Sequence, residues 1–172
     1  KKLGFTSITL HRPSNVDDEK ILKPIVNFLI DDVSSKEIVL WPVHPRTKKQ
    51  LIKFGLWDAL LKNENIILLS PLNYQEMLKI NMMSKIMLTD SGGIQEECSV
   101  IGTSCLTLRE NTERPITLRE NGGTSILVGN DIKRIREEYK IAFKSKYNPK
   151  KIKLWDGNTG ARCLDAIINY DL

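Results

Sequence analysis

The sequence predicts an α/β fold: a Rossmann-like parallel β-sheet flanked by α-helices. Two observations lead to this fold class. Short apolar runs recur along the chain, and most of them are separated by segments with helical spacing. Alternation of this kind is typical of strand–helix–strand units whose strands run parallel. The 172 residues fit a single domain, residues 1–172, with one hydrophobic core.

Six apolar runs have the character of β-strands. They lie at residues 5–10, 37–41, 66–69, 86–89, 104–108 and 125–128. In open parallel sheets a ligand binds beyond the carboxyl ends of the strands. We therefore expect the residues that carry chemistry to follow these runs directly.

The segments between the strands predict helices. The first begins near Asp17, with acidic residues in its first turn and one apolar face. Others are expected at residues 47–61 with a break at Gly55, and at 74–83, 94–100, 116–120, 131–143 and 160–170. Gly102 has a C-cap role after the fourth helix, and Asn130 or Asp131 caps the helix at 131–143. The basic stretch 144–153 is expected to be a connector.

Composition excludes several classes of protein. The chain is 41% hydrophobic and 27% charged, with a net charge of +5, as in ordinary soluble globular proteins. The basic residues are spread out and lack interleaved aromatic residues, so we expect no nucleic-acid binding. No apolar run approaches the roughly eighteen residues of a membrane span, and no signal-peptide pattern is present. Three cysteines without Cys-x-x-Cys spacing fit a reducing cytoplasm.

Residues 88–97 have the layout of a nucleotide-phosphate cradle. An apolar run is followed at once by Ser91, Gly92 and Gly93, and then by a helix-like segment. Glycines let a phosphate approach the main chain, and the first N–H groups of a helix point at it. Glu97, one turn into the helix, is placed to accept hydrogen bonds from sugar hydroxyls. The simpler alternative is that the Gly pair only turns a strand into a helix.

The cradle differs from two common phosphate-binding motifs. It has neither the Gly-Lys-Ser/Thr of the P-loop nor the three glycines of the dinucleotide fingerprint. An ATPase or a nicotinamide enzyme is therefore disfavoured.

Polar clusters follow four of the expected strands, at residues 9–13, 42–46, 90–93 and 109–115. They include His11 and His44, each of which is either a structural or a functional imidazole. Arg114 is either one member of a surface ion pair or a cation that is held by Glu113 and aimed at a diphosphate. With only two histidines and no third ligand at metal spacing, we expect no zinc site.

Four segments together carry a family resemblance. Residues 9–17, 88–97, 108–115 and 154–157 resemble, in order, the motifs of the non-hydrolysing UDP-N-acetylglucosamine 2-epimerases. One departure is visible, because Ser14 stands where members often have Glu. The resemblance implies a two-domain enzyme of GT-B type, with a UDP-sugar bound between two Rossmann-like halves. The chain resembles the C-terminal half, and its start at Lys1 without an initiator Met also indicates an excised part whose N-terminal half is absent.

The resemblance also implies roles for individual residues. Ser91, Gly92 and Gly93 are expected to bind the diphosphate, Glu97 the ribose and Arg114 the nucleotide. The backbone near Leu72 and Met77 is expected to face the uracil.

Both histidines match family positions. His11 matches the catalytic histidine at the reacting end of the substrate. His44 matches a histidine near the domain cleft, which in some bacterial members belongs to a second, activating UDP-sugar site.

The reaction implied is the interconversion of UDP-N-acetylglucosamine and UDP-N-acetylmannosamine, by elimination of UDP and its re-addition. No cofactor and no metal is needed. The acid–base carboxylates lie in the N-terminal half, so this chain alone is expected to be inactive. The family commonly forms homodimers. Open alternatives are a nucleotide-sugar-binding half of a GT-B glycosyltransferase, a hydrolysing UDP-N-acetylglucosamine 2-epimerase, and a regulatory binding domain without chemistry.

Overall fold

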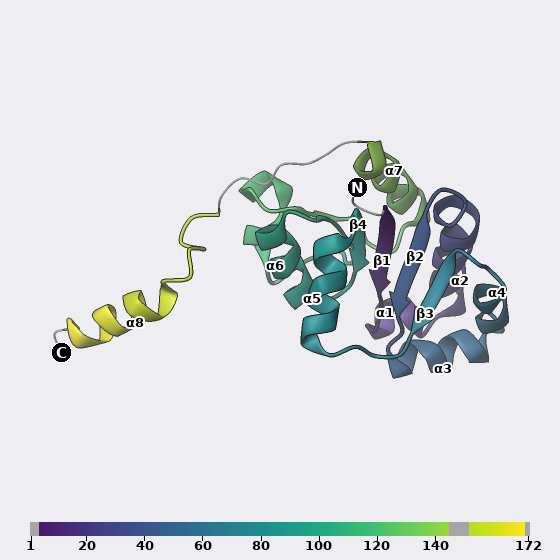
Figure 1. The fold of residues 1–172 in the computed structure, drawn as a ribbon, viewed down its shortest axis with the longest axis horizontal. Helices are drawn as coiled ribbons and strands as arrows, with labels where there is room; N and C mark the ends of the chain where they lie inside the picture. The colour runs from purple at the N-terminus through teal and green to yellow at the C-terminus, as the bar shows by residue number, and fades with distance from the viewer. Residues whose placement is uncertain (1–3, 145–151, 171–172) are drawn as a thin grey trace.

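The computed structural model describes residues 4–144 and 152–170. Its strands form one six-stranded sheet in the order β3-β2-β1-β4-β5-β6 (Figure 1), and all neighbouring strands are parallel. The strands are β1 (Phe5–Thr9), β2 (Ile38–Pro42), β3 (Ile66–Leu69), β4 (Ile86–Thr89), β5 (Ser104–Thr107) and β6 (Ser125–Leu127). The predicted fold class, a Rossmann-like parallel sheet flanked by helices, is confirmed.

The helices occupy the connections between the strands and the segment that follows the last strand. They are α1 (Pro13–Val16), α2 (Glu19–Phe28), α3 (Pro45–Lys53), α4 (Trp57–Leu61), α5 (Tyr74–Met83), α6 (Gly92–Ile101), α7 (Ile132–Lys144) and α8 (Thr159–Ile168). A π-helical turn (Leu29–Val33) extends α2, and two 3₁₀ turns (Pro115–Thr117 and Arg119–Asn121) follow β5. The predicted break at Gly55 is confirmed, since this residue has φ 67° between α3 and α4.

Several helix boundaries differ from the prediction. The chain forms α1 before Asp17 because Pro13, whose φ is already helical, suits the first position of a helix. Asp18 then caps α2, with its side chain accepting from the N–H of Lys20 at 2.8 Å. The fourth predicted helix starts two residues early, at Gly92, and ends as expected at Gly102, which has φ 85°. Most of the predicted connector, residues 145–151, lies outside the described residues.

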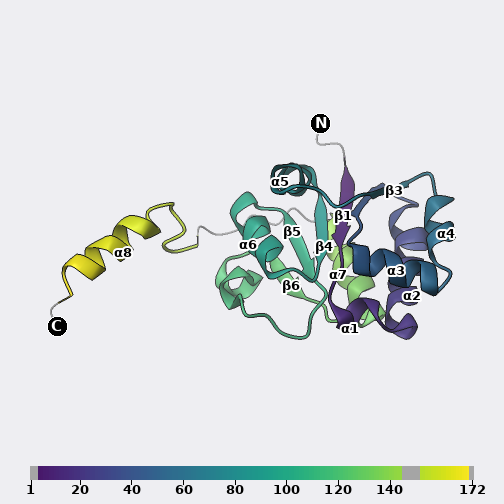
Figure 2. The ribbon, with the colours of Figure 1, turned by 90° about the horizontal axis from the view of Figure 1, so that it is seen from below.

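The strand order places helices on both faces of the sheet (Figures 1 and 2). The chain moves one way from β1 to β3 and the other way from β4 to β6, and right-handed crossovers therefore lie on opposite faces. On one face α2 packs against α7, and on the other α5 packs against α6.

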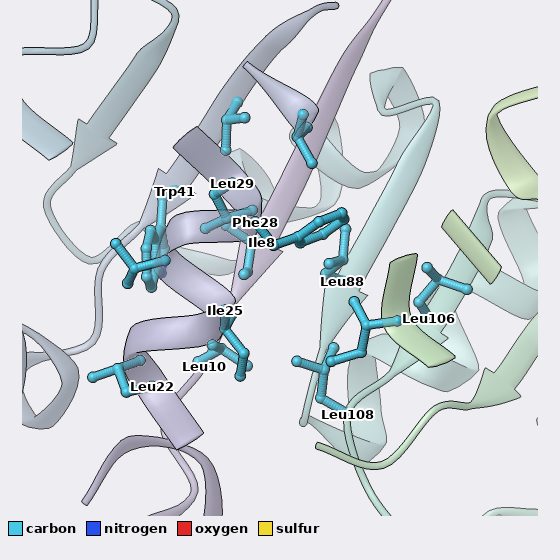
Figure 3. Packing of buried hydrophobic residues seen from close by; sticks show 14 of the residues in the cluster. Ile8, Leu10, Leu22, Ile25, Phe28, Leu29, Trp41, Leu88, Leu106 and Leu108 are labelled. Carbon is cyan, nitrogen blue, oxygen red and sulfur yellow. The ribbon is translucent and has the colours of Figure 1, made fainter. Parts of the chain in front are cut away.

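The main core lies between the sheet and α2, with α7 beside it. Ile8, Ile25, Phe28, Trp41 and Leu88 are among its fully buried side chains (Figure 3). This packing fixes where each strand ends. By contrast, α8 lies apart from the sheet in both ribbon views and holds no buried residue.

Candidate functional site

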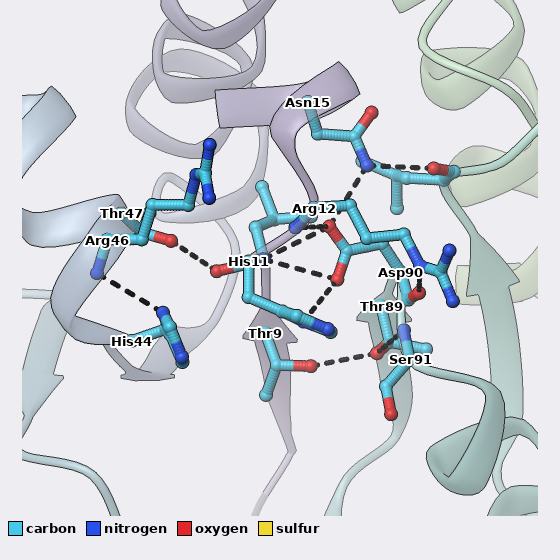
Figure 4. Close-up of polar contacts among 12 residues, drawn as sticks. Thr9, His11, Arg12, Asn15, His44, Arg46, Thr47, Thr89, Asp90 and Ser91 are labelled. Atoms are coloured by element: carbon cyan, nitrogen blue, oxygen red, sulfur yellow. Dashed lines mark hydrogen bonds and ion pairs between the residues drawn. The ribbon is translucent and has the colours of Figure 1, made fainter. Parts of the chain in front are cut away.

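Four loops meet at the carboxyl edge of the sheet. His11 follows β1, His44 follows β2, Ser91 follows β4, and the loop 109–115 follows β5. Figure 4 shows the first three together. The expectation that the polar clusters share one edge is confirmed.

Asp90 is the centre of this edge. Its side chain is fully buried. The carboxylate accepts from the backbone N–H of His11 at 3.1 Å and of Arg12 at 2.9 Å, and from Nδ2 of Asn15 at 3.1 Å. Oδ1 also lies 2.8 Å from Nδ1 of His11. Burial opposes ionisation, but the hydrogen bonds from His11, Arg12 and Asn15 lower the pKa of Asp90, which is therefore a carboxylate at neutral pH.

The carboxylate orients His11. A carboxylate only accepts, so Nδ1 must be the donor and Nε2 is the ring nitrogen left for another partner. The His11 side chain is 41% exposed, which keeps that nitrogen within reach of a ligand. Sequence reasoning singled out His11 but missed Asp90 as a site residue. Its position between a buried strand and the Gly pair was the available signal.

His44 lies beside His11. The two ring centroids are 5.7 Å apart. Nδ1 of His44 accepts from the backbone N–H of Arg46 at 3.2 Å, which caps α3. Arg46 in turn pairs with Asp17, and hydrogen bonds from Arg46 and Gln50 lower the pKa of Asp17 to about 2. His44 is thus both a structural cap and a neighbour of His11.

The residues predicted to form the cradle lie at the start of α6. Ser91 is the N-cap residue, and its side chain makes no cap hydrogen bond. Its backbone N–H donates to Oγ1 of Thr89 at 3.0 Å, and Thr89 is itself bonded to Thr9 across the strands at 2.8 Å. A Cβ on Gly93 would meet nothing within 4 Å. The start of α6 is therefore open at Gly93, whereas a Cβ on Gly92 would meet Oε1 of Glu113 at 2.9 Å.

Gln95 joins α6 to the loop after β5. This side chain is fully buried. Its Nε2 donates to the carbonyl of Ser91 at 3.2 Å, and its Oε1 accepts from the hydroxyl of Thr112 at 2.8 Å. The hydroxyl of Thr112 also accepts from the backbone N–H of Arg114 at 3.0 Å. Gln95, which sequence reasoning missed, holds the Arg114 backbone next to the start of α6.

The predicted pairing of Arg114 with Glu113 is wrong. Nε of Arg114 lies 2.8 Å from Oε1 of Glu96, on α6. Glu113 instead lies 2.6 Å from Nη1 of Arg109 and 3.6 Å from Nη2 of Arg12. The neighbouring side chains of Glu113 and Arg114 thus have different partners, which the sequence pattern did not reveal.

The remaining predicted site residues lie along α5 and α6. Glu97 accepts from Nδ2 of Asn81 at 3.3 Å. Leu72 borders a hollow of about 320 Å³ between the sheet and α5, and Glu76 lies at the same hollow. Met77 packs instead against the small buried cluster of Met87, Cys98 and Cys105.

The described residues hold no group of three or more His, Cys, Asp or Glu side chains placed to bind a metal ion. Within 4–144 and 152–170, every helix is too short or too polar to cross a membrane.

Comparison with known proteins decides the family. Residues 1–168 match the sequence model of the family described as UDP-N-acetylglucosamine 2-epimerase. The chain belongs to this family. The UDP-N-acetylglucosamine 2-epimerase of Methanocaldococcus jannaschii is 40% identical over 165 residues, which make up 95% of this chain and 44% of that protein. A Pseudomonas aeruginosa relative, a UDP-2,3-diacetamido-2,3-dideoxy-D-glucuronate 2-epimerase, is 36% identical over 64% of this chain and 29% of its own length.

Solved structures of the family have the same fold as this chain. The M. jannaschii UDP-GlcNAc 2-epimerase in complex with UDP-GlcNAc and UDP has a TM-score of 0.83 at 37% identity, over 96% of this chain and 45% of that one. An E. coli heptosyltransferase solved with ADP has a TM-score of 0.55 at 9% identity, over 83% of this chain and 46% of its own, a likeness of fold alone. The family member described here spans less than half the length of these relatives. It is equivalent to the C-terminal domain of a GT-B type, two-domain enzyme.

Proposed function

We propose that this member of the UDP-N-acetylglucosamine 2-epimerase family is the UDP-binding half of an enzyme that interconverts UDP-N-acetylglucosamine and UDP-N-acetylmannosamine. UDP is eliminated to leave a glycal-type intermediate and is then added back. One observation carries the proposal: the Asp90-oriented His11 lies at the same sheet edge as the start of α6 (Figure 4). A diphosphate at α6 would thus have an imidazole beside it.

We assign the diphosphate to the start of α6. Gly92 and Gly93 supply N–H groups without intrahelical acceptors, and Ser91 supplies a hydroxyl that makes no cap hydrogen bond. Arg114 adds a positive charge, 39% exposed at its side chain. Donors that are already in position stabilise the charge that develops on a departing diphosphate. This is the catalytic contribution that we assign to the chain, together with His11 at the sugar end.

The nucleoside is assigned to α5 and the exposed side of α6. Glu97 would accept from the ribose hydroxyls, with Asn81 sharing the carboxylate. The backbone near Leu72 and Met77, at the start of α5, would face the uracil. The solved relative that holds UDP-GlcNAc and UDP supports this class of ligand.

The partners of the chain are also proposals. The relatives are about twice as long, which supports an N-terminal half that closes over the sugar and supplies the acid–base carboxylates. We further propose a homodimer of the whole enzyme, a cytoplasmic location, a single domain at residues 1–172, and a place for His44 at a second UDP-sugar site. The P. aeruginosa relative acts on another sugar by its name, so the sugar is proposed only as a 2-acetamido sugar.

Calorimetric titration with UDP and UDP-N-acetylglucosamine tests the nucleotide site. Saturable UDP binding is expected to weaken at least about tenfold in Arg114→Ala, the loss of one charge-assisted contact. Arg134→Ala, which removes an exposed arginine on α7, is the matched control. Equal UDP affinity in both variants would contradict the site. The chain alone is expected to show no epimerisation, and measurable turnover would contradict the assignment of the carboxylates to the other half.

A further inference from the structure

The carboxylate of Glu113 lies over the first residue of α6. A Cβ added to Gly92 would come within 2.9 Å of Oε1 and 3.7 Å of Cδ of Glu113. The start of a ten-residue helix favours negative charge, because its first N–H groups lack internal partners. Glu113 thus places an anion where the proposed function places a phosphate.

Two arginines converge on the same carboxylate. Arg109, with only 11% of its side chain exposed, lies 2.6 Å from one oxygen of Glu113, and Arg12 lies 3.6 Å from the other. Nε of Arg12 donates to the carbonyl of Asp90 at 2.8 Å, which holds the guanidinium beside Ser91 (Figure 4). The arrangement therefore carries two cationic groups and a helix start around one carboxylate.

Glu113 is negatively charged in this arrangement. A hydrogen bond with its own backbone N–H and another with Arg109 lower the pKa of the carboxyl. The side chain is nevertheless 45% exposed, so it can rotate into solvent without leaving a cavity. Arg109, in contrast, is held in place by burial.

We infer that Arg12 and Arg109 are further diphosphate-binding residues, and that Glu113 is an internal anion which occupies their site until a diphosphate displaces it. This inference rests on the proposed function. A diphosphate carries more negative charge than one carboxylate and offers more acceptor oxygens to two guanidinium groups. It therefore replaces Glu113 in both ion pairs, and Glu113 lowers the affinity by competition.

Titration calorimetry with UDP and with inorganic pyrophosphate tests the competition. Glu113→Gln keeps the shape of the side chain and removes its charge. It is expected to raise the affinity for both ligands by about threefold to tenfold, as for one removed charge at a protein surface. The control Glu120→Gln removes the same charge from an exposed residue and is expected to change the affinity by less than about twofold. Arg12→Gln added to Glu113→Gln is expected to reverse the gain.

The outcomes separate this inference from the proposed function. Arg114→Ala reports on the nucleotide site itself, because Arg114 pairs with Glu96 and not with Glu113. If Arg114→Ala weakens UDP binding while Glu113→Gln leaves it unchanged or weaker, the competition is overturned and the nucleotide site stands. If neither variant alters UDP binding, the nucleotide site is elsewhere and both fail. Circular dichroism of each variant confirms that it is folded.

Discussion

Nδ1 of His11 lies 2.8 Å from Oδ1 of Asp90, although the two residues are 79 positions apart in the sequence. The backbone N–H of His11 donates to the same carboxylate. One buried side chain therefore sets both the main-chain path after β1 and the tautomer of the imidazole. This pair joins the β1 loop to the cradle after β4.

Asp90→Asn is expected to destabilise the fold by about 2–4 kcal/mol, because an amide can accept only through one atom and its NH₂ group would face buried donors. Urea denaturation measures this loss. Asp58→Asn, an exposed substitution in α4, is the control and should stay within about 0.5 kcal/mol of the wild type. Equal stability of the two variants would contradict the central role of Asp90.

The carboxylate of Asp90 is also expected to make the stability of the fold depend on pH in the acid range. The folded state lowers the pKa of Asp90, so its contribution is complete above the unfolded value of about 3.9 and is lost as pH falls through the folded pKa. The unfolding free energy is therefore expected to fall below about pH 4. Denaturant unfolding at a series of pH values should show that the free energy of unfolding declines less in Asp90→Asn than in the wild type as pH falls. The same decline in both proteins would contradict this role of the Asp90 carboxylate.

Gly92 and Gly93 provide a matched pair in α6. A methyl group at Gly92 would meet the flexible end of Glu113 and, at 3.9 Å, Cγ of Arg114, and one at Gly93 would meet nothing within 4 Å. Both alanine variants are therefore expected to fold, with stability unchanged or raised by up to about 1 kcal/mol. UDP titration should show at least about tenfold weaker binding for Gly92→Ala than for Gly93→Ala. The opposite order would place the diphosphate further along the helix.

Gln95→Leu is expected to cost about 1–3 kcal/mol, since it leaves the hydroxyl of Thr112 and the carbonyl of Ser91 without their buried partner. Hydrogen exchange at the N–H of Arg114 should become faster, because the loop loses its anchor. Gln75→Leu, at an exposed position of α5, serves as the control. Unchanged exchange in Gln95→Leu would mean that the loop is held by other contacts.

Gly123 lies in the turn that follows the loop of Arg114, and its substitution tests how closely this turn is packed. A Cβ at this position would overlap the carbonyl of Thr117, a backbone atom that cannot rotate away. Gly123→Ala is therefore expected to lower the free energy of unfolding by about 3 kcal/mol or more. A Cβ at Gly160, in α8, would meet nothing within 4 Å, and Gly160→Ala should stay near the wild type in a thermal melt. Similar melting temperatures would contradict the close packing of the turn.

Many of the strands and helices were predictable because they depend on residues that are close together in the sequence. The expected strands 66–69 and 86–89 and the helix 74–83 coincide with β3, β4 and α5, since apolar runs and helical spacing reflect burial of neighbouring residues. Boundaries were harder where tertiary contacts decide them. The α6 helix extends back to Gly92 although glycine disfavours helix, because Thr89 holds the Ser91 backbone at its first turn.

The position of the site was predictable from the sequence, but the ion pairs between its side chains were not. The rule that ligands lie beyond the carboxyl ends of parallel strands placed His11, His44 and Ser91 at one edge. It could not assign Glu113 to Arg109 instead of Arg114, because this depends on the direction in which each side chain of the loop points.

The sequence by itself determined the order of strands and helices, the family motifs and the loops that carry the polar residues, since these depend on short-range spacing. Only the tertiary structure decided that Asp90 holds His11, that Gln95 anchors the Arg114 loop, and that Glu113 lies over Gly92. These contacts join strands and loops far apart in the chain. Their geometry follows from the packing of the whole sheet, which fixes where each strand ends.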